Sequence, residues 1–191
     1  ELKANERLLM PRRMLNCVER LVSAAKDMEQ IRRGKDIFKI VYLVTCVETL
    51  QKLKGRNDLD KKEMLFDFFE NYTSACNKQY IRKHFSRIGD EINGTEDTFW
   101  QFISMLNECR NCATHEGEYW DLCFNNGDSQ TPLLIVSVAQ LHGNAKKEQY
   151  GFETTLSYKT FEYIFVQNCI NFIMQYIQSQ GKPQMPIPKR T

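Results

Sequence analysis

Apolar positions recur at helical spacing along most of the chain, and they predict a mainly α-helical fold. After Pro11, which suits the first turn of a helix, apolar side chains return every three or four residues as far as about Arg33. Gly34 interrupts this pattern, and a second helix runs from about Asp36, which we expect to cap it, to about Lys54. Because the second helix is apolar on most sides, we expect it at the centre of a helical bundle.

Capping and turn residues divide the next part of the chain into three further helices. Asp60 and Glu63 have the spacing of a capping box and predict the start of the third helix. A fourth helix is expected over about 74–88, and a fifth begins with Thr95 or Thr98 as its cap. The expected buried positions of the third and fourth helices are Met64, Leu65, Phe68, Phe69, Tyr72, Tyr80, Ile81, Phe85 and Ile88.

The pattern changes near residue 132, where short β-branched and loosely alternating segments flank a polar loop. These segments predict a small β-hairpin inserted over about 132–157. Ser157 is then placed to cap a last helix, and we expect the tail at 181–191 to be extended or disordered. The predicted fold is therefore a single mainly α domain over 1–180, with about six helices and the hairpin before the last one.

Composition and charge narrow the classes of function. Lys and Arg number 26 against 24 Asp and Glu, a net charge of +2, so the chain lacks the strongly basic coat of many nucleic-acid-binding proteins. Its seven scattered cysteines predict reduced thiols and a cytoplasmic location. No stretch reaches the roughly 18 to 20 uninterrupted apolar residues of a membrane span, so we expect no membrane association.

The most specific candidate functional residues of the chain lie near the C-terminal end of the fifth predicted helix. Arg110 and Asn111 come first, and His115 follows. Arginine holds phosphate through a planar fork of donors, and histidine transfers protons near neutral pH. An Arg and a His at this spacing arise often by chance, and the Asn directly after the Arg makes the pattern more specific.

Arg110-Asn111-x-x-x-His115 resembles the RNxxxH form of the Rx4-6H motif of HEPN domains. These domains are helical bundles, and many are metal-independent ribonucleases in toxin–antitoxin, phage-defence and CRISPR-linked systems. The resemblance covers the helical body, roughly 5–116 and 158–180, whereas the hairpin is not part of the minimal bundle. It implies an endoribonuclease in a defence or toxin-like system, with RNA as substrate and an antitoxin or regulatory protein as a further partner.

The resemblance also implies a role for each motif residue. His115 would act as general acid or base, and Arg110 would hold the scissile phosphate. Asn111 would orient His115 or the phosphate by hydrogen bonding. The product would carry a 2′,3′-cyclic phosphate, and neither a metal nor another cofactor would be required.

The spacing of the motif restricts how its residues meet. On a regular α-helix, residues five apart point about 140° away from each other. Either the helix therefore ends before His115, or Arg110 and His115 come from two chains. HEPN proteins commonly dimerise with their motifs facing each other, so the resemblance implies a homodimer with a composite active site.

Two further groups of residues are candidates for RNA contact. A basic run on the fourth helix is either an RNA-binding face or an ordinary solvated face, and two aromatic residues after the motif either stack on a base or close the core. These residues are Lys78, Arg82, Lys83 and Arg87 in the first group, and Tyr119 and Trp120 in the second.

A structural role competes with catalysis for the motif. Arg110 is able to interact with the helix C-terminus or to pair with Glu108 or Glu116, and His115 is able to cap the helix. The alternative function is then a non-catalytic HEPN-like dimer that binds RNA, a nucleotide or a partner protein.

Cysteine chemistry offers two more alternatives at the same place. Cys109, Cys112, His115 and Cys123 have the residue types of a Cys3His zinc site, although the Cys-x2-Cys pair falls within a helix. Thiol catalysis by Cys112 with His115 would need an orienting partner, and the sequence does not point to one.

Overall fold

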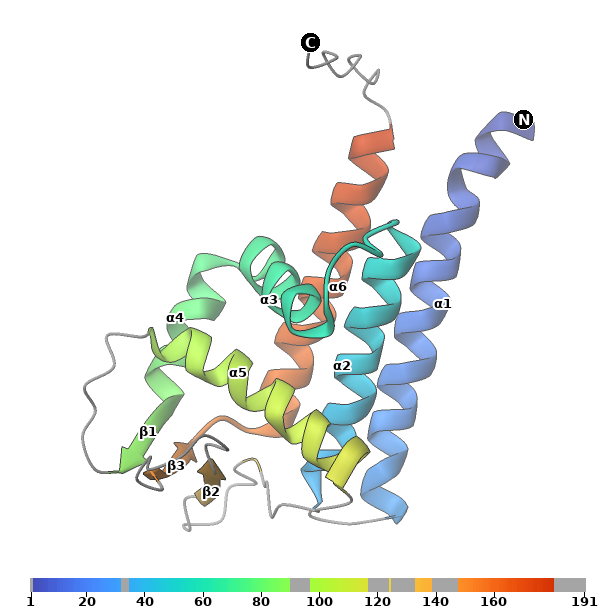
Figure 1. Ribbon diagram of the computed structural model, residues 1–191. Helices are drawn as coiled ribbons and strands as arrows, with labels where there is room; N and C mark the ends of the chain where they lie inside the picture. Colours follow the sequence, from blue (N-terminus) through green and yellow to red (C-terminus); the bar gives the residue numbers. More distant parts are fainter. Residues whose placement is uncertain are drawn as a thin grey trace.

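Six α-helices and a small antiparallel sheet make up the part of the chain that the structure describes (Figure 1). This computed structural model describes residues 2–31, 35–89, 97–116, 124, 133–138 and 148–180. The helices are α1 (Leu2–Ile31), α2 (Asp36–Leu53), α3 (Lys61–Tyr72), α4 (Ala75–His84), α5 (Thr98–Asn111) and α6 (Tyr158–Gln180), and the strands are β1 (Phe85–Gly89), β2 (Leu133–Val138) and β3 (Glu148–Thr154). A π-helical turn, Cys112–Glu116, follows α5. The prediction of a mainly α fold with a small hairpin is confirmed.

Helix α2 lies at the centre of the bundle, as its apolar composition predicts. It packs against α1, α3 and α5, and Figure 1 shows α5 crossing it. Its buried apolar residues include Ile40, Val44 and Val47, which recur at helical spacing. Among the helices described, none has both the length and the apolar character that crossing a membrane requires.

Aromatic side chains of α3 and α6 fill the core beside α2. The Phe68 ring lies 5.8 Å from that of Phe165 and 6.0 Å from that of Phe172, measured between centroids. All five residues predicted as the core face of the third helix are buried. Burying such large rings supplies much of the apolar area that holds a domain together.

Two predicted caps are confirmed. The Glu63 N–H donates to Asp60 Oδ1 at 2.7 Å, and the Asp60 N–H donates to Glu63 Oε2 at 2.8 Å, which completes the capping box of α3. Ser157 Oγ accepts from the Thr160 N–H at 3.1 Å at the start of α6. Both pairs satisfy N–H groups that have no partner within the first helical turn.

Two other helix starts differ from the predictions. Helix α1 begins at Leu2, so Pro11 lies inside it and not in its first turn. Proline lacks a backbone N–H, and α1 nevertheless continues through Pro11 to Ile31. At α2, Lys35 is the N-cap and Asp36 is already helical, because the Asp36 side chain instead accepts from the Phe124 N–H at 2.7 Å and pairs with Lys39 at 2.6 Å.

The start of α5 also differs from the prediction. Asp97 caps it by accepting from the Phe99 N–H at 2.9 Å, and Thr98 is the first helical residue. Thr95 lies outside the described residues. Aspartate accepts this hydrogen bond as readily as threonine and also carries a charge that suits a helix N-terminus.

The prediction of a fourth helix over 74–88 is wrong beyond His84. Residues after it form β1, which pairs with β3. The Thr155 N–H donates to the His84 carbonyl at 2.9 Å, and the Phe85 ring stacks on Phe152 at 5.1 Å. Tyr80, expected to be buried, is 40% exposed. Long-range pairing with β3 outweighs the helical pattern of these few residues.

The sheet has the order β1-β3-β2, and both pairings are antiparallel. Strands β2 and β3 are the hairpin predicted from the sequence. Because β3 lies in the middle, the hairpin is joined through β1 to the end of α4. The insertion is therefore connected to the helical body by backbone hydrogen bonds.

Candidate functional site around Arg110

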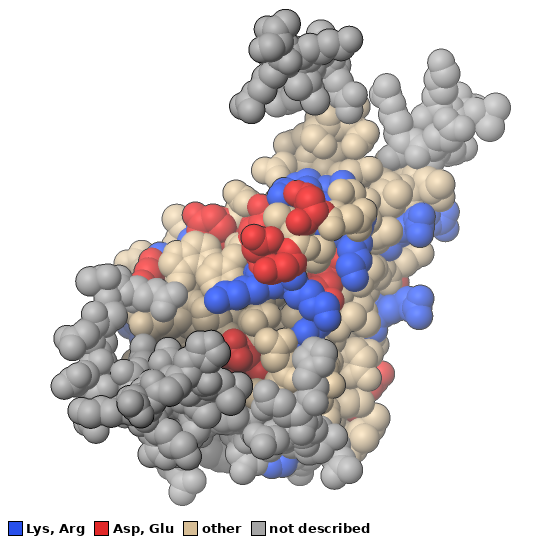
Figure 2. Space-filling view, viewed as in Figure 1, with Lys and Arg blue, Asp and Glu red and all other residues tan. Residues whose placement is uncertain are grey.

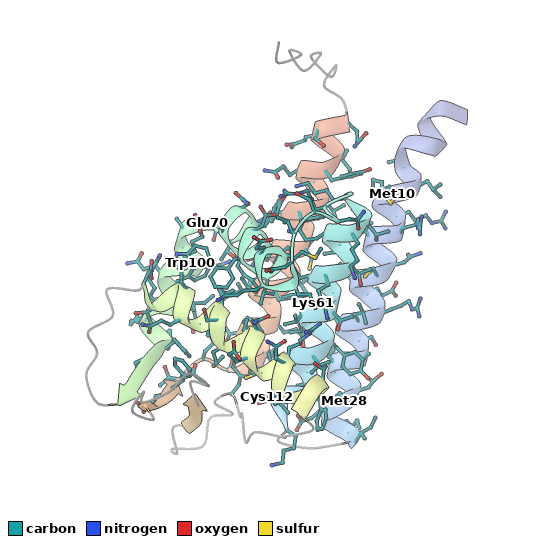
Figure 3. The ribbon with its side chains drawn as sticks, viewed as in Figure 1. Met10, Met28, Lys61, Glu70, Trp100 and Cys112 are labelled. Carbon is teal, nitrogen blue, oxygen red and sulfur yellow. The ribbon has the colours of Figure 1, made fainter. Side chains whose placement is uncertain are left out.

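Arg110 is the second-last residue of α5 and is buried, with 7% of its surface exposed. Trp100 and Cys112, labelled in Figure 3, mark the two ends of this helix region. The C-terminal end of α5 meets α2, and there the guanidinium group lies between the two helices.

Glu48 of α2 is the ionic partner of Arg110. Arg110 Nη2 donates to Glu48 Oε1 at 2.7 Å, and Arg110 Nη1 donates to Asn111 Oδ1 at 3.0 Å. Glu48 is itself only 8% exposed. A buried charge is costly unless it is paired and hydrogen-bonded, so each residue makes the burial of the other tolerable.

The structural role of Arg110 differs from the one that the sequence suggested as an alternative to catalysis. The sequence suggested a surface pair with Glu108 or Glu116, and the structure has a buried pair with Glu48 from another helix. Sequence reasoning did not single out Glu48. The available signal was a lone carboxylate in the middle of an otherwise apolar helix, since such a residue is rarely buried without a partner.

A π-helical turn separates Arg110 from His115. The α-helix ends at Asn111, and residues 112–116 continue in the wider π form. The Thr114 hydroxyl donates to the Arg110 carbonyl at 2.8 Å and so helps to hold this turn. Hydrogen bonds from i to i+5 place more residues in each turn, and backbone positions 110 and 115 therefore lie nearer to one face than in an α-helix. The side chain of His115 is outside the described part.

Two of the four basic residues predicted for RNA contact are paired with carboxylates. Lys78 Nζ lies 3.0 Å from Glu70 Oε2, and Arg82 Nε donates to Asp97 Oδ1 at 2.7 Å. Lys83 is exposed. Figure 2 shows acidic side chains interspersed among the basic ones on the face in view. The structure thus gives Lys78 and Arg82 a role in joining α4 to α3 and to the start of α5.

The structure does not bring this basic run to Arg110. Arg82 meets the start of α5 at Asp97, which lies thirteen residues before Arg110, or about 20 Å along the helix. Arg87 lies on β1, with its side chain outside the described part. Tyr119 and Trp120 also lie outside the described residues.

Nothing in the described residues supports cysteine chemistry at the site. These residues contain no group of three or more His, Cys, Asp or Glu side chains arranged to hold a metal ion, and Cys123 lies outside them. Cys109 is buried, and burial raises the pKa of its thiol well above the ordinary value. A neutral buried thiol is a poor nucleophile.

Comparison with family models, with curated proteins and with solved structures gives no match for this chain. The functional argument therefore rests on the residues themselves.

Proposed function

We propose that the protein is a metal-independent endoribonuclease of the HEPN type, with Arg110, Asn111 and His115 as its catalytic residues. The observation that carries this proposal is the end of α5, where a buried, hydrogen-bonded Arg110 is followed by a π-helical turn that contains His115. Turns of this kind are rare, and they occur frequently at functional sites.

The chemistry assigns a distinct task to each group. His115 would take the proton from the 2′-hydroxyl or give one to the leaving 5′-oxygen. Arg110 would stabilise the charge that develops on the phosphate. Asn111, which accepts a hydrogen bond from Arg110, would position the guanidinium. RNA cleavage by these groups yields a 2′,3′-cyclic phosphate, and the host role would be defence or toxin-like, under an antitoxin or regulatory partner.

Glu48 adds a positioning residue to this proposal. Its carboxylate holds Arg110 Nη2, so it restricts the guanidinium to one orientation. Preorganised donors stabilise a transition state without reorganising at the moment of reaction. A phosphate would have to approach the guanidinium beside Glu48, which makes access to Arg110 a requirement for activity.

The test is cleavage of single-stranded RNA in the presence of EDTA. We expect His115→Gln to lower the rate by roughly 10²- to 10⁴-fold, the usual contribution of general acid–base catalysis. His84→Gln is the matched control and should cleave normally, because His84 lies at the far end of α4, where it bonds Thr155. Undiminished cleavage by His115→Gln would exclude the proposed role.

Arg110 is best tested by Arg110→Lys. Lysine keeps a positive charge beside Glu48 and loses the fork that binds phosphate through two donors. We expect a fall in the rate of about 10²- to 10³-fold with the fold retained. Arg110→Ala would leave Glu48 buried without a partner, so it would confuse loss of stability with loss of catalysis.

A second candidate function is a non-catalytic protein of the same fold that binds RNA, a nucleotide or a partner protein. The observation in its favour is the burial of Arg110 and its neutralisation by Glu48. RNA binding without any cleavage product, over a range of single-stranded substrates, would favour this candidate over the enzyme.

A further inference from the structure

Three cysteine side chains meet where α1 packs against α2 and α6. Figure 1 shows α1 and α2 running side by side. The Cys46 thiol of α2 lies within hydrogen-bonding distance of the thiols of Cys17 in α1 and Cys169 in α6. All three are free thiols. We propose that Cys17 and Cys46 form a modification site, at which a peroxide converts the two thiols into a disulfide that joins α1 to α2.

Exposure selects which two of the three cysteines react. Cys46 and Cys169 are completely buried, whereas Cys17 is only partly buried. A peroxide that arrives from solvent therefore reaches Cys17 first, and the thiol in contact with Cys17 is that of Cys46. The expected bond is thus Cys17–Cys46 and not Cys46–Cys169.

The packing of the two helices allows this bond. Cα atoms that face each other across two packed helices lie roughly 4 to 6 Å apart, which is the spacing that a disulfide requires. Cys17 contacts Thr49 as well as Cys46, and these two residues lie one turn apart on α2, so Cys17 faces that helix directly. The described residues contain no group of three such side chains arranged to hold a metal ion, so the arrangement favours covalent pairing of two thiols.

The reaction takes two steps and consumes one peroxide. The Cys17 sulfur attacks a peroxide oxygen, an S–O bond forms as the O–O bond breaks, and the thiol proton leaves in a water molecule. The Cys46 sulfur then attacks the sulfenic acid at Cys17, so the S–S bond forms, the S–O bond breaks and a second water departs with the Cys46 proton. The two sulfurs lose two electrons in total, and the peroxide oxygens gain them.

The surroundings of Cys17 set the pace of the first step. Hydrogen bonding with Cys46 and burial raise the pKa of the Cys17 thiol, and the positive charge of Arg20, one turn further along α1, acts in the opposite direction. Because the thiolate is the nucleophile, Cys17 should react with peroxide slowly. The pair therefore stays reduced until an oxidant accumulates, which agrees with the reduced thiols predicted from the sequence.

The bond would restrain α1 and α2 without entering the Arg110 site. It would close the chain between residues 17 and 46 and so reduce the freedom of the unfolded state. Cys46 points about 160° away from Glu48 on α2, so the bond lies on the other side of this helix from Arg110. The proposal does not depend on the ribonuclease activity, and failure of either leaves the other intact.

The experiment treats the folded protein with hydrogen peroxide until Cys76, an exposed thiol on α4, is oxidised. Remaining thiols are blocked with iodoacetamide, and tryptic peptides are analysed by mass spectrometry. We expect peptide 14–20 linked to peptide 40–52, with a mass lower by two hydrogen atoms than the sum of the two. The midpoint of thermal unfolding should rise by roughly 5 to 15 °C, and dithiothreitol should reverse both changes.

Two variants and a gel complete the test. Cys17→Ser should lose both the linked peptide and the rise in the unfolding midpoint, whereas the matched control Cys76→Ser should keep both. Circular dichroism establishes that each variant is folded, and Cys17→Ala replaces Cys17→Ser if the latter unfolds. Cys46 that stays free after Cys76 is oxidised overturns the proposal. A link from Cys46 to Cys169 also overturns it, as does a disulfide-linked dimer on a non-reducing gel.

Discussion

At the scale of single residues, the buried Arg110–Glu48 pair links the stability of the fold to the proposed phosphate-binding group. Two charges removed from water gain little net stability from each other, because desolvation offsets much of their attraction. Removing one of them leaves the other uncompensated, which is far more costly. Loss of either residue should therefore destabilise the fold, whether or not Arg110 also binds phosphate.

A double-mutant cycle measures this coupling. Glu48→Ala should lower the free energy of unfolding by about 3 to 5 kcal/mol, because Arg110 would be left buried without its carboxylate. The double variant Glu48→Met with Arg110→Met should recover most of that loss, since both charges are gone and the volume is retained. Denaturant unfolding gives the values, and additive losses in the double variant would show that the two residues are not coupled.

At the scale of an element, the start of α5 depends on Asp97. Its carboxylate caps the helix by accepting a hydrogen bond from the Phe99 N–H. It also accepts a hydrogen bond from the guanidinium group of Arg82 in α4. Hydrogen bonding from Arg82 holds the pKa of Asp97 below its ordinary value. One side chain thus fixes the start of the helix whose other end carries Arg110.

Two substitutions separate the cap from the charge. Asp97→Ala removes both and should cost about 1 to 2 kcal/mol of stability, whereas Asp97→Asn keeps the capping acceptor and should cost less. Because the folded state lowers the pKa of Asp97, its ionic contribution is present above its ordinary pKa of about 4 and is lost as the pH falls through the lower folded-state pKa. Thermal unfolding from pH 7 to pH 2 should show wild type and Asp97→Asn converging in acid.

At the scale of the whole molecule, the proposed active site is supplied either by one chain or by two. The family resemblance implies two. The end of the α-helix at Asn111 and the π-helical turn after it favour the one-chain arrangement, because they bring positions 110 and 115 nearer to one face.

Mixing two inactive chains distinguishes these arrangements. Arg110→Lys retains His115, and His115→Gln retains Arg110, so a two-chain site would be rebuilt in a mixed dimer. We expect no recovery of RNA cleavage when the two variants are combined at high concentration. Recovery of a substantial part of the wild-type rate would instead establish a site shared between chains.

Much of the fold was predictable because it depends on residues close together in sequence. The capping box of α3, the cap at Ser157 and the apolar face of α3 all follow from contacts within a few positions. The helix that ends at Arg110 and Asn111 was also predicted, because its apolar residues recur at helical spacing. The two strands of the hairpin were recognised by their change of pattern.

The local pattern failed where partners from distant parts of the chain compete. Phe85 suits a helix or a strand equally well, and pairing of β1 with β3 decides between them. Asp36 has the residue type of a cap, yet it bonds Phe124 and Lys39 instead. Such choices depend on the free energy of contacts that sequence spacing does not reveal.

The sequence by itself determined the helical bundle and its hairpin, because the spacing of apolar residues and helix capping depend on residues a few positions apart. It also determined the order Arg110, Asn111, His115. Only the tertiary structure decided that Glu48 holds Arg110 and that Lys78 and Arg82 are paired with carboxylates. Each of these depends on which helices meet, and burial and ion pairing between distant residues are set only when the chain has folded.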